Sequence, residues 1–314
     1  MAEIIVAAVA SCSPSLITHP IEVAKLRIQL QGELQRKIPK RIYRNVPQAI
    51  YTIVRHDGLL AIYRGLIPGL GYQLVANGLR LGIFQIIEDF GFTLDGNLEP
   101  SIKLSAYSGA VSGAIGAFAG SPLFLLKTHM QVQSATAKIA VGYQHGYTSA
   151  RSAFLEIYRR QGIKHGLWRA TTSNMLRIST ASAIQLATFT GTKSLLNTAC
   201  EWKERYFFIN TVLAAFFSGL LSAPVIAAVD VLRCRMYAQP STPSGEGLYY
   251  KSIWDCIRKI KKTEGVRGFA KGAGGAFLYT LMTSSITLVS WDELKSKRKE
   301  RRHSRDYYID FGYQ

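Results

Sequence analysis

The sequence has few cysteines, and none of them stands in a short pair. The four lie far apart, with no Cys-x-x-Cys spacing: Cys12, Cys200, Cys234 and Cys256. A disulfide framework or a zinc site is therefore not expected, and a non-oxidising location is favoured. The histidines also lack the spacing of metal ligands, so no metal site is predicted.

The N-terminus lacks a basic segment. No Lys or Arg precedes the apolar run that follows Met1, which argues against a secretory signal or an Arg-rich transit peptide. We predict instead that this run begins a first helix of the mature protein. The chain also shows no nucleophile–base arrangement and no phosphate-binding loop, so neither an enzyme nor a cofactor is predicted.

Acidic residues are scarce relative to basic ones. The 314 residues include 20 Asp and Glu against 38 Lys and Arg, which gives a formal net charge of +18. Such a surface favours anionic partners, among them nucleic acid, anionic lipid and small anionic solutes. The mean hydropathy is close to zero, so composition alone does not reveal whether the chain spans a membrane.

Three similar segments recur along the chain. The segment that begins at Pro20 resembles the one at Pro122, and a third begins at Ala228, where alanine replaces the proline. Their starts lie roughly one hundred residues apart, which suits two membrane helices and a loop. Each is followed by two further motifs: Asp57-Gly58 and Tyr63-Arg64-Gly65, Gln161-Gly162 and Trp168-Arg169-Ala170, and Glu264-Gly265 and Lys271-Gly272.

Hydrophobic patterning predicts two long helices in each repeat. Apolar stretches rich in small residues cover 4–31, 103–134 and 206–238, and a second set covers 67–91, 171–196 and 273–296. Between the members of each pair lie basic loops and amphipathic segments near 45–56, 147–161 and 250–263. Basic loops mark the side that is not translocated, so both termini are expected on the opposite face. We divide the chain into repeats at 1–100, 101–200 and 201–298 and a basic tail at 299–314.

These motifs resemble those of the mitochondrial carrier family, solute carrier family 25. The family pattern is Pro-x-Asp/Glu-x-x-Lys/Arg-x-Lys/Arg, then Asp/Glu-Gly, then aromatic-Lys/Arg-Gly, three times over, and here it spans about 4–297. Several stretches are also similar to the subgroup around members 34 and 35, which is akin to fungal oxaloacetate carriers: 29–35, 72–82, 127–129, and Arg177 with Gln185 and Leu186.

The resemblance implies an all-α membrane protein with six transmembrane helices. They would form three pseudo-symmetric repeats of two helices, each repeat with a short amphipathic matrix helix. It also implies a monomeric, multi-pass protein of the mitochondrial inner membrane, with both termini towards the intermembrane space.

A network of charges on the odd-numbered helices is expected to close the matrix end. A proline permits each helix to kink, so the three helices can converge there. In the family the acid of each helix pairs with the base of the next. Glu22 would therefore pair with Lys127, and Asp230 with Lys25. The alternative is that these charges are interfacial residues extending out of the bilayer.

The third bridge of this matrix gate is expected to be missing. Arg233 would meet Phe124 where the family has an acid. Gln29 and Gln131 match the glutamine that braces such bridges, and the third copy has Tyr237 there.

A second gate, on the cytoplasmic side, is expected to be weak. In the family it is formed by aromatic-Asp/Glu-x-x-Lys/Arg on the even-numbered helices, and only the third copy, with Asp292 and Lys295, keeps the full motif. Gln85 could bond Lys193, while Asp292 would meet Glu88, a like charge. Since exposed ion pairs contribute only about 0.2–1 kcal/mol each, the resting protein is expected to be closed at the matrix gate and open towards its termini.

The substrate site is expected near the membrane midplane, between the repeats. The family's contact points on the even-numbered helices correspond to Tyr72, Arg177 and Tyr279. A mid-helix arginine such as Arg177 needs an anionic partner or water. Where the related subgroup has arginine at the third contact, this chain has Tyr279, which favours a smaller or less charged anion than a tricarboxylate.

Further polar residues of the same helix are predicted at this site. Arg80 lies about two turns beyond Tyr72 and should face the same cavity, and Gln73 and Asn77 are four apart, so they share a face with Arg80 or its flank. Together with Arg177, Arg80 could hold two carboxylates or a sulfate through forked hydrogen bonds. The alternative is that both arginines belong to structural ion pairs.

Phospholipid is expected at two helix starts, because free backbone amides bind phosphate well. By resemblance to the family, Arg64 with Gly65 and Lys271 with Gly272 would bind cardiolipin, whereas the second repeat departs with Ala170.

The leading hypothesis is an inner-membrane carrier of small anions that works by alternating access. Oxaloacetate, malonate and sulfate are candidate substrates. The alternatives are a carrier for nucleotides or amino acids, and a carrier-like anion or proton conductance or non-transporting adaptor. A soluble nucleic-acid binder would explain the charge, but it would not explain six apolar segments, so no nucleic-acid partner is predicted.

Overall fold

The computed structural model describes residues 2–35, 41–93, 101–200, 207–280 and 282–283. Apart from loops and one isolated bridge between Ser241 and Gly247, these ranges are helical. Residues 273–280 are helical too, and most of the predicted span at 273–296 lies outside the described residues. The long helices are α1 (Ala2–Leu30), α3 (Leu66–Asp89), α4 (Ile102–Val132), α6 (Thr171–Cys200) and α7 (Phe207–Ala238).

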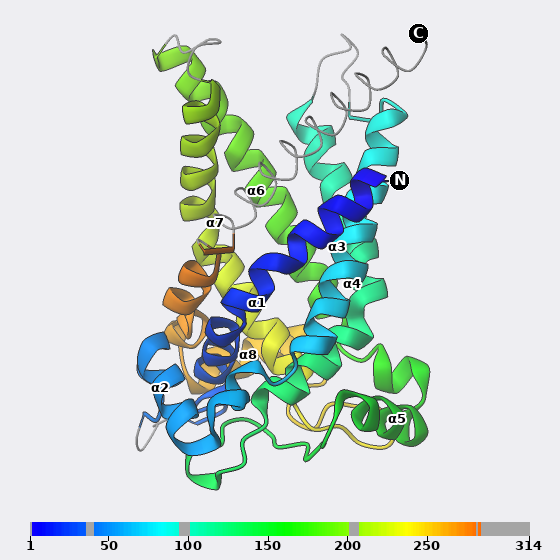
Figure 1. Ribbon diagram of the computed structural model, residues 1–314, viewed down its shortest axis with the longest axis vertical. Helices are drawn as coiled ribbons and strands as arrows, with labels where there is room; N and C mark the ends of the chain where they lie inside the picture. The colour runs from blue at the N-terminus through cyan, green and yellow to red at the C-terminus, as the bar shows by residue number, and fades with distance from the viewer. Residues whose placement is uncertain (1, 36–40, 94–100, 201–206, 281, 284–314) are drawn as a thin grey trace, which may run out of the picture.

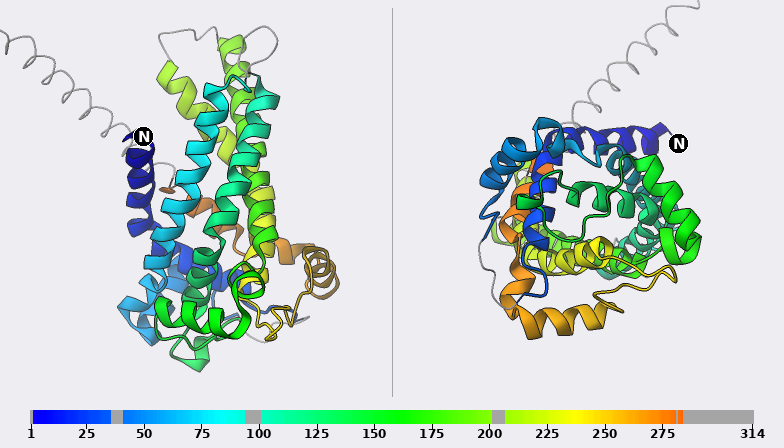
Figure 2. Two further views of the ribbon diagram at one scale, coloured as in Figure 1. Left: turned by 90° about the vertical axis from the view of Figure 1, so that its right-hand side faces the viewer. Right: turned by 90° about the horizontal axis from the view of Figure 1, so that it is seen from below.

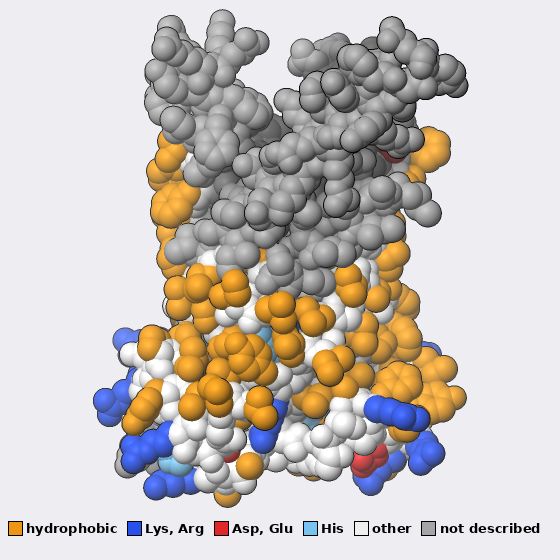
Figure 3. Space-filling view, in the orientation of Figure 1, with side chains coloured by type: hydrophobic (Ala, Val, Ile, Leu, Met, Phe, Trp, Pro, Cys, Tyr) orange, Lys and Arg blue, Asp and Glu red, His pale blue; other side chains and the backbone are white. Residues whose placement is uncertain are grey.

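The long helices surround a central axis, and shorter helices lie at one end of it (Figures 1 and 2). The short helices match the predicted amphipathic segments and are α2 (Val46–Asp57), α5 (Ala150–Gln161) and α8 (Ile253–Thr263). On the visible face, a hydrophobic band lies above this end, where Lys and Arg side chains gather (Figure 3). Two helical stretches of the described chain are long and apolar enough to span a membrane, Leu59–Asp89 and Ala106–Val132.

Small residues bring α3 and α4 into close contact. A Cβ on Gly116 would lie only 2.4 Å from the carbonyl oxygen of Ala76, so a larger residue would force the helices apart. Such close backbone approach is typical of helix pairs in membranes.

The long helices contain internal prolines: Pro14 and Pro20 in α1, Pro122 in α4 and Pro224 in α7.

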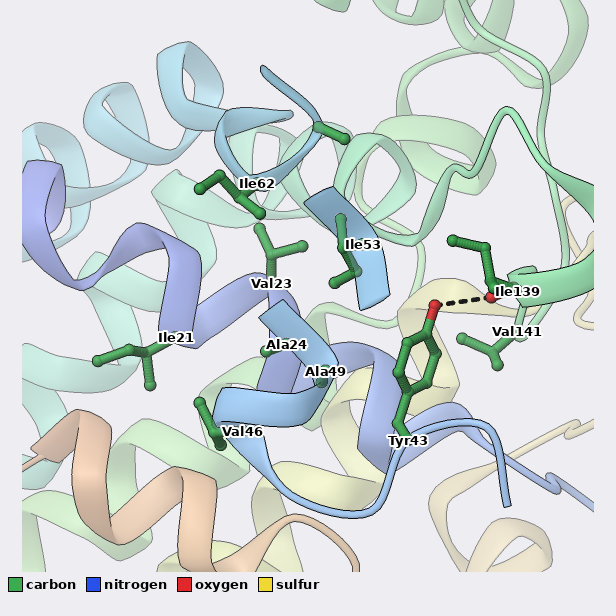
Figure 4. Packing of buried hydrophobic residues seen from close by; sticks show 11 residues of the cluster. Ile21, Val23, Ala24, Tyr43, Val46, Ala49, Ile53, Ile62, Ile139 and Val141 are labelled. Atoms are coloured by element: carbon green, nitrogen blue, oxygen red, sulfur yellow. Dashed lines mark hydrogen bonds between the residues drawn. The ribbon is translucent and has the colours of Figure 1, made fainter. Parts of the chain in front are cut away.

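Each short helix begins at a side-chain cap. Asn45, Ser149 and Ser252 each accept a hydrogen bond from the backbone N–H three residues further on, which satisfies a free donor of the first turn. The apolar face of α2 packs against α1, with Ile53 fully buried (Figure 4). In the same cluster the Tyr43 hydroxyl donates to the Ile139 carbonyl at 2.7 Å.

Buried ion pairs join the short helices of the first and third repeats to the long helices α1 and α7. Arg27 Nη1 lies 3.2 Å from Asp57 Oδ2, and both side chains are fully buried. Arg235 Nη1 lies 2.5 Å from Glu264 Oε1 in the same manner. Burial alone would raise the pKa of the Asp57 carboxyl, but the hydrogen bond from Ser134 and the ion pair with Arg27 together lower it.

The turn that leads into the next long helix differs in the second repeat. In the first and third repeats it is a 3₁₀ helix, η1 (Leu59–Tyr63) and η4 (Val266–Ala270), but in the second it is a π-helical turn, η3 (Ile163–Leu167). The second repeat has one more residue between its Gly162 and Arg169 than the other copies have, and a wider π turn accommodates that residue.

We predict that Asp57→Asn lowers the free energy of unfolding by about 3–5 kcal/mol, because it leaves the guanidinium of Arg27 buried without its counter-charge. Thermal unfolding of the detergent-purified protein measures this effect. The matched control is Asp255→Asn, because Asp255 forms a partly exposed pair with Lys259 on α8. That change should alter stability by about 1 kcal/mol or less. Equal losses in the two variants would contradict the assigned role of burial.

Candidate functional site

Two ion pairs join the odd-numbered helices near the end covered by the short helices. Lys127 Nζ of α4 lies 2.6 Å from Glu22 Oε1 of α1. Lys25 Nζ of α1 lies 2.6 Å from Asp230 Oδ2 of α7. Three of these side chains are almost fully buried, and Glu22 is 14% exposed. The structure thus brings together both pairs predicted from the sequence. Because these side chains are buried in pairs, they do not extend out of the bilayer into the interface, which was the alternative.

Asp230 has more partners than a pairwise bridge would supply. Besides Lys25, its carboxylate accepts hydrogen bonds from Gln29 Nε2 at 3.3 Å and from Arg233, one turn further along α7. Arg177 Nε of α6 lies 3.6 Å from Oδ1. The side chain of Asp230 is 1% exposed, so this carboxylate is a buried junction between α1, α6 and α7.

Phe124 replaces the third acid with an aromatic face. The guanidinium carbon of Arg233 lies 4.2 Å from the centre of the Phe124 ring, which is the geometry of a cation–π contact. The ring is flanked by Tyr72, at 5.2 Å between centroids, and by Tyr237 at 4.9 Å. The Tyr237 hydroxyl is hydrogen-bonded to Ser121 of α4, so Tyr237 joins α7 to α4 where the other repeats have glutamine.

The two glutamines predicted to brace the bridges behave differently. Gln29 binds Asp230 as expected. Gln131 is also buried, but its amide nitrogen has no hydrogen-bond partner in the described part of the chain, and its backbone carbonyl accepts from Arg27 at 3.3 Å.

The tyrosines predicted as substrate contacts lie against the charge network. Lys25 Nζ is 5.2 Å from the centre of the Tyr279 ring, and Lys127 Nζ is 6.0 Å from the centre of the Tyr72 ring. The residues predicted for the substrate site and those predicted for the matrix gate are therefore in contact with one another.

Asn174 is a central residue that the sequence analysis did not select. It is fully buried. Its side-chain oxygen accepts from the Tyr72 hydroxyl at 3.4 Å and from Arg233 at 3.3 Å, and its nitrogen donates to the Ala117 carbonyl at 3.0 Å. A side-chain amide three residues before Arg177 shares its helix face, and that spacing could have identified it.

Arg177 and Arg80 supply further positive charge in this region. The two guanidinium groups are close enough to repel one another, and the Nε of each is buried with no hydrogen-bond partner among the described residues. The pairing of Arg177 with Asp230 at 3.6 Å partly bears out the alternative of a structural ion pair. Asn77 Nδ2 donates a hydrogen bond to Gln73 Oε1 at 2.6 Å, so the two side chains share a helix face.

The charges of this region do not balance. Two carboxylates, Glu22 and Asp230, face five cations: Lys25, Lys127, Arg233, Arg177 and Arg80. The described part of the site therefore carries an excess of three positive charges. Because buried charge is costly unless it is paired, the site is chemically suited to an anion with more than one negative charge.

Other predicted site residues lie elsewhere. The cytoplasmic gate cannot be placed, since Asp292 and Lys295 and the side chains of Gln85 and Lys193 lie outside the described residues. At the helix starts, Lys271 Nζ is bound to Glu264 at 2.6 Å, and Arg64 donates to the Gln133 carbonyl at 2.9 Å. Gly65 and Gly272 adopt positive φ angles of 81° and 74° just before their helices.

Charge exchange should distinguish the two ion pairs. We expect Glu22→Lys or Lys127→Glu alone to destabilise the protein by about 3–5 kcal/mol, and the two together to recover most of that loss. Exchanging Lys25 and Asp230 should recover little, because a lysine at 230 would face Arg233 and Arg177. The unfolding temperatures of the six variants measure this difference, and equal recovery in the two exchanges would show that Asp230 is not a junction.

Comparison with known proteins gives a consistent result. The mitochondrial carrier protein model matches residues 1–93, 99–199 and 204–301. The chain is 38% identical to human solute carrier family 25 member 35, over 94% of this chain and 97% of that protein. It is 35% identical to the mitochondrial oxaloacetate transport protein of Schizosaccharomyces pombe (92% and 88%), and 32% identical to mitochondrial citrate transporter E of Aspergillus niger (95% and 93%). These matches confirm the predicted fold of six spans in three repeats. The chain therefore belongs to the mitochondrial carrier family, and it is a transporter rather than an enzyme.

Proposed function

We propose that this carrier moves small dicarboxylates or oxoacids, such as oxaloacetate or malonate, or sulfate, across the mitochondrial inner membrane by alternating access. The observation that carries the proposal is the excess of positive charge around Arg177 and Arg80. A forked guanidinium recognises a carboxylate or sulfate through paired hydrogen bonds. The relative in Schizosaccharomyces pombe is named as an oxaloacetate transporter, which supports an anionic substrate of this size.

The third contact favours a small anion over a tricarboxylate. On the helical segment at 273–280, Tyr279 stands where an additional cation would suit a third carboxylate, and Lys25 Nζ lies over its ring. Arg177 and Arg80 provide two fixed charges, which match the two carboxylates of a short diacid. Gln73 and Asn77 remain as neutral partners for a carbonyl or hydroxyl oxygen.

Binding would be coupled to opening through Arg177. Its Nε is shared with Asp230 at 3.6 Å, which is longer than a hydrogen bond. A substrate carboxylate that binds Arg177 competes with Asp230 for the same guanidinium. Asp230 would then hold fewer cations, and the contacts between α1, α6 and α7 would weaken. A ligand shifts such an equilibrium only by its difference in affinity for the two states, and this competition supplies that difference.

The matrix gate, the side of the termini and the lipid contacts complete the proposal. The charge network that includes Glu22, Lys127 and Asp230 would be the matrix gate, with the termini on the opposite, intermembrane side. The start of α3 after Gly65 has no side-chain cap, so its free amides remain available to a cardiolipin phosphate. The corresponding start after Gly272 would bind a second one.

Uptake into liposomes tests the proposal. We expect the purified carrier to exchange oxaloacetate, malonate or sulfate, and Arg177→Ala to lower the rate at least about tenfold, since losing a charged contact costs about 2–5 kcal/mol and each 1.4 kcal/mol is about tenfold. Arg177→Lys keeps the charge without the fork and should be intermediate. The control is Arg151→Ala, an exposed position on α5, which should transport normally.

Three outcomes would overturn the assignment. Undiminished uptake of a diacid by Arg177→Ala would remove this arginine from the site. Uptake of nucleotides or amino acids, with none of diacids or sulfate, would replace the substrate class. A substrate-independent proton or anion leak as the sole activity would favour the conductance alternative.

A further inference from the structure

The matrix-end ion pair of the first and third repeats has no counterpart in the second repeat. Seven residues after Pro20 and Ala228 stand Arg27 and Arg235, which bind the carboxylates of Asp57 and Glu264. At the same two places the second repeat has His129 and Gln161. Both partners of the pair have changed, so this repeat lacks the carboxylate that the other two bury.

The side chains at these places in the second repeat have other contacts. The His129 ring stacks on His145, with 3.6 Å between ring centroids. Gln161 Nε2 donates to Ser241 Oγ at 2.8 Å and to the Thr242 carbonyl at 3.1 Å. Neither contact supplies negative charge.

A positive charge nevertheless remains buried here. Arg169 is only 8% exposed. Its Nη2 donates to the carbonyls of Tyr237 at 3.3 Å and Gln239 at 3.1 Å, and lies 3.3 Å from His129 Nε2. Its Nε and Nη1 have no partner in the described residues. In the third repeat the equivalent Lys271 is 2.6 Å from Glu264, so a carboxylate neutralises the cation there.

Arg169 is one of the residues that line a cavity between α4, α5 and the following loops. The cavity has a volume of about 120 Å³, well above the about 10–15 Å³ that one water needs. Besides Arg169 it is lined by polar groups on α4, α5 and the loops, among them His129, His145, Gln161 and Ser241. Its one lining carboxylate, Glu156, is exposed and pairs with Arg160 at 2.9 Å.

His145 does not add charge to this cavity at neutral pH. Burial, and to a lesser degree repulsion by Arg169, lowers the pKa of His145 to about 4, although its hydrogen bond to the Ala238 carbonyl opposes the shift. A neutral imidazole offers one donor and one acceptor. The uncompensated charge at the cavity is therefore that of Arg169.

We propose that this cavity is a second anion site, which binds a small oxyanion (a carboxylate, phosphate or sulfate group) in place of the carboxylate that the other repeats carry themselves. The oxyanion accepts from Nε and Nη1 of Arg169, with the Gln161 amide and the Ser241 hydroxyl beside it. An isolated buried guanidinium is costly, and a charge-assisted pair relieves that cost. The site is separate from the transport pathway, since Arg169 precedes the start of α6 at Thr171 and lies eight residues before Arg177.

Occupancy of this site would stabilise the end of the protein that carries the short helices. Arg169 and His129 both contact the Tyr237 carbonyl of α7, and Gln161 ends α5. An anion bound there would hold α5 against α4 and α7, as Asp57 and Glu264 hold α2 and α8. The concentration of oxyanion on that side of the membrane would then tune the stability of the closed network.

Thermal unfolding of the full chain with increasing sodium sulfate or phosphate, against chloride at equal ionic strength, tests the proposal. All variants carry Arg177→Ala and Arg80→Ala, so both arginines proposed to bind the transported anion are removed. We expect a saturable rise of roughly 2–6 °C in this parent. Adding Gln161→Glu, which restores the missing carboxylate, should abolish the saturable rise and increase the unfolding temperature without anion. Adding Arg169→Gln should abolish the rise as well.

Gln35→Glu is the matched control, because it adds the same charge at an exposed position after α1 and should keep the full response. A non-saturating rise of equal size in all variants is the general effect of excluded salts, and it would overturn the proposal. A saturable rise that persists in Gln161→Glu would also overturn the proposal. This result does not depend on whether Arg169→Gln folds. A free oxyanion and a lipid phosphate are distinguished by repeating the titration with cardiolipin: a response to cardiolipin alone would assign the site to lipid.

Discussion

The buried carboxylate of Asp230 is the constraint on which the rest of the site depends. An ionised group with 1% exposure cannot be left unpaired, and here its partners come from three helices. Lys25 and Gln29 belong to α1, Arg177 to α6 and Arg233 to α7 itself. Because breaking any one of these contacts leaves charge buried, the convergence of α1, α6 and α7 is fixed by electrostatics as much as by packing.

In the proposed mechanism this junction couples the recognition of substrate to the closure of one end of the carrier. The same region holds five cations against two carboxylates, so it attracts an anion, and the cation best placed to meet that anion is already shared with Asp230. Phe124 contributes to this excess of positive charge, because an acid at its position would neutralise Arg233. In the proposed mechanism the unequal repeats therefore have different roles: Glu22–Lys127 is a simple bridge, whereas the Asp230 junction responds to ligand.

The sequence predicted the helices and two ion pairs, but it did not predict that Asp230 has several cationic partners. Hydrophobic patterning was sufficient for α2, α5 and α8, and the resemblance to the carrier family supplied the pairs Glu22–Lys127 and Lys25–Asp230, because in that family the acid of each odd-numbered helix pairs with the base of the next. The sequence could not predict Arg177 beside Asp230, Tyr279 beneath Lys25 or the role of Asn174. These contacts depend on side-chain reach across an interface, where one turn of difference changes the partner. The additional residue before Arg169 was visible in the sequence, but the sequence did not predict that a π-helical turn would accommodate it.

The affinity of Asp230→Asn for the transported anion tests the central claim most directly. If Asp230 competes with substrate for Arg177, removing its charge frees the guanidinium and should lower the dissociation constant by about five- to tenfold, the equivalent of about 1 kcal/mol. Glu22→Gln removes a carboxylate of the same network that does not contact Arg177, so it should change the affinity much less. An unchanged or weaker affinity in Asp230→Asn would contradict the account, because substrate and gate would then not share Arg177.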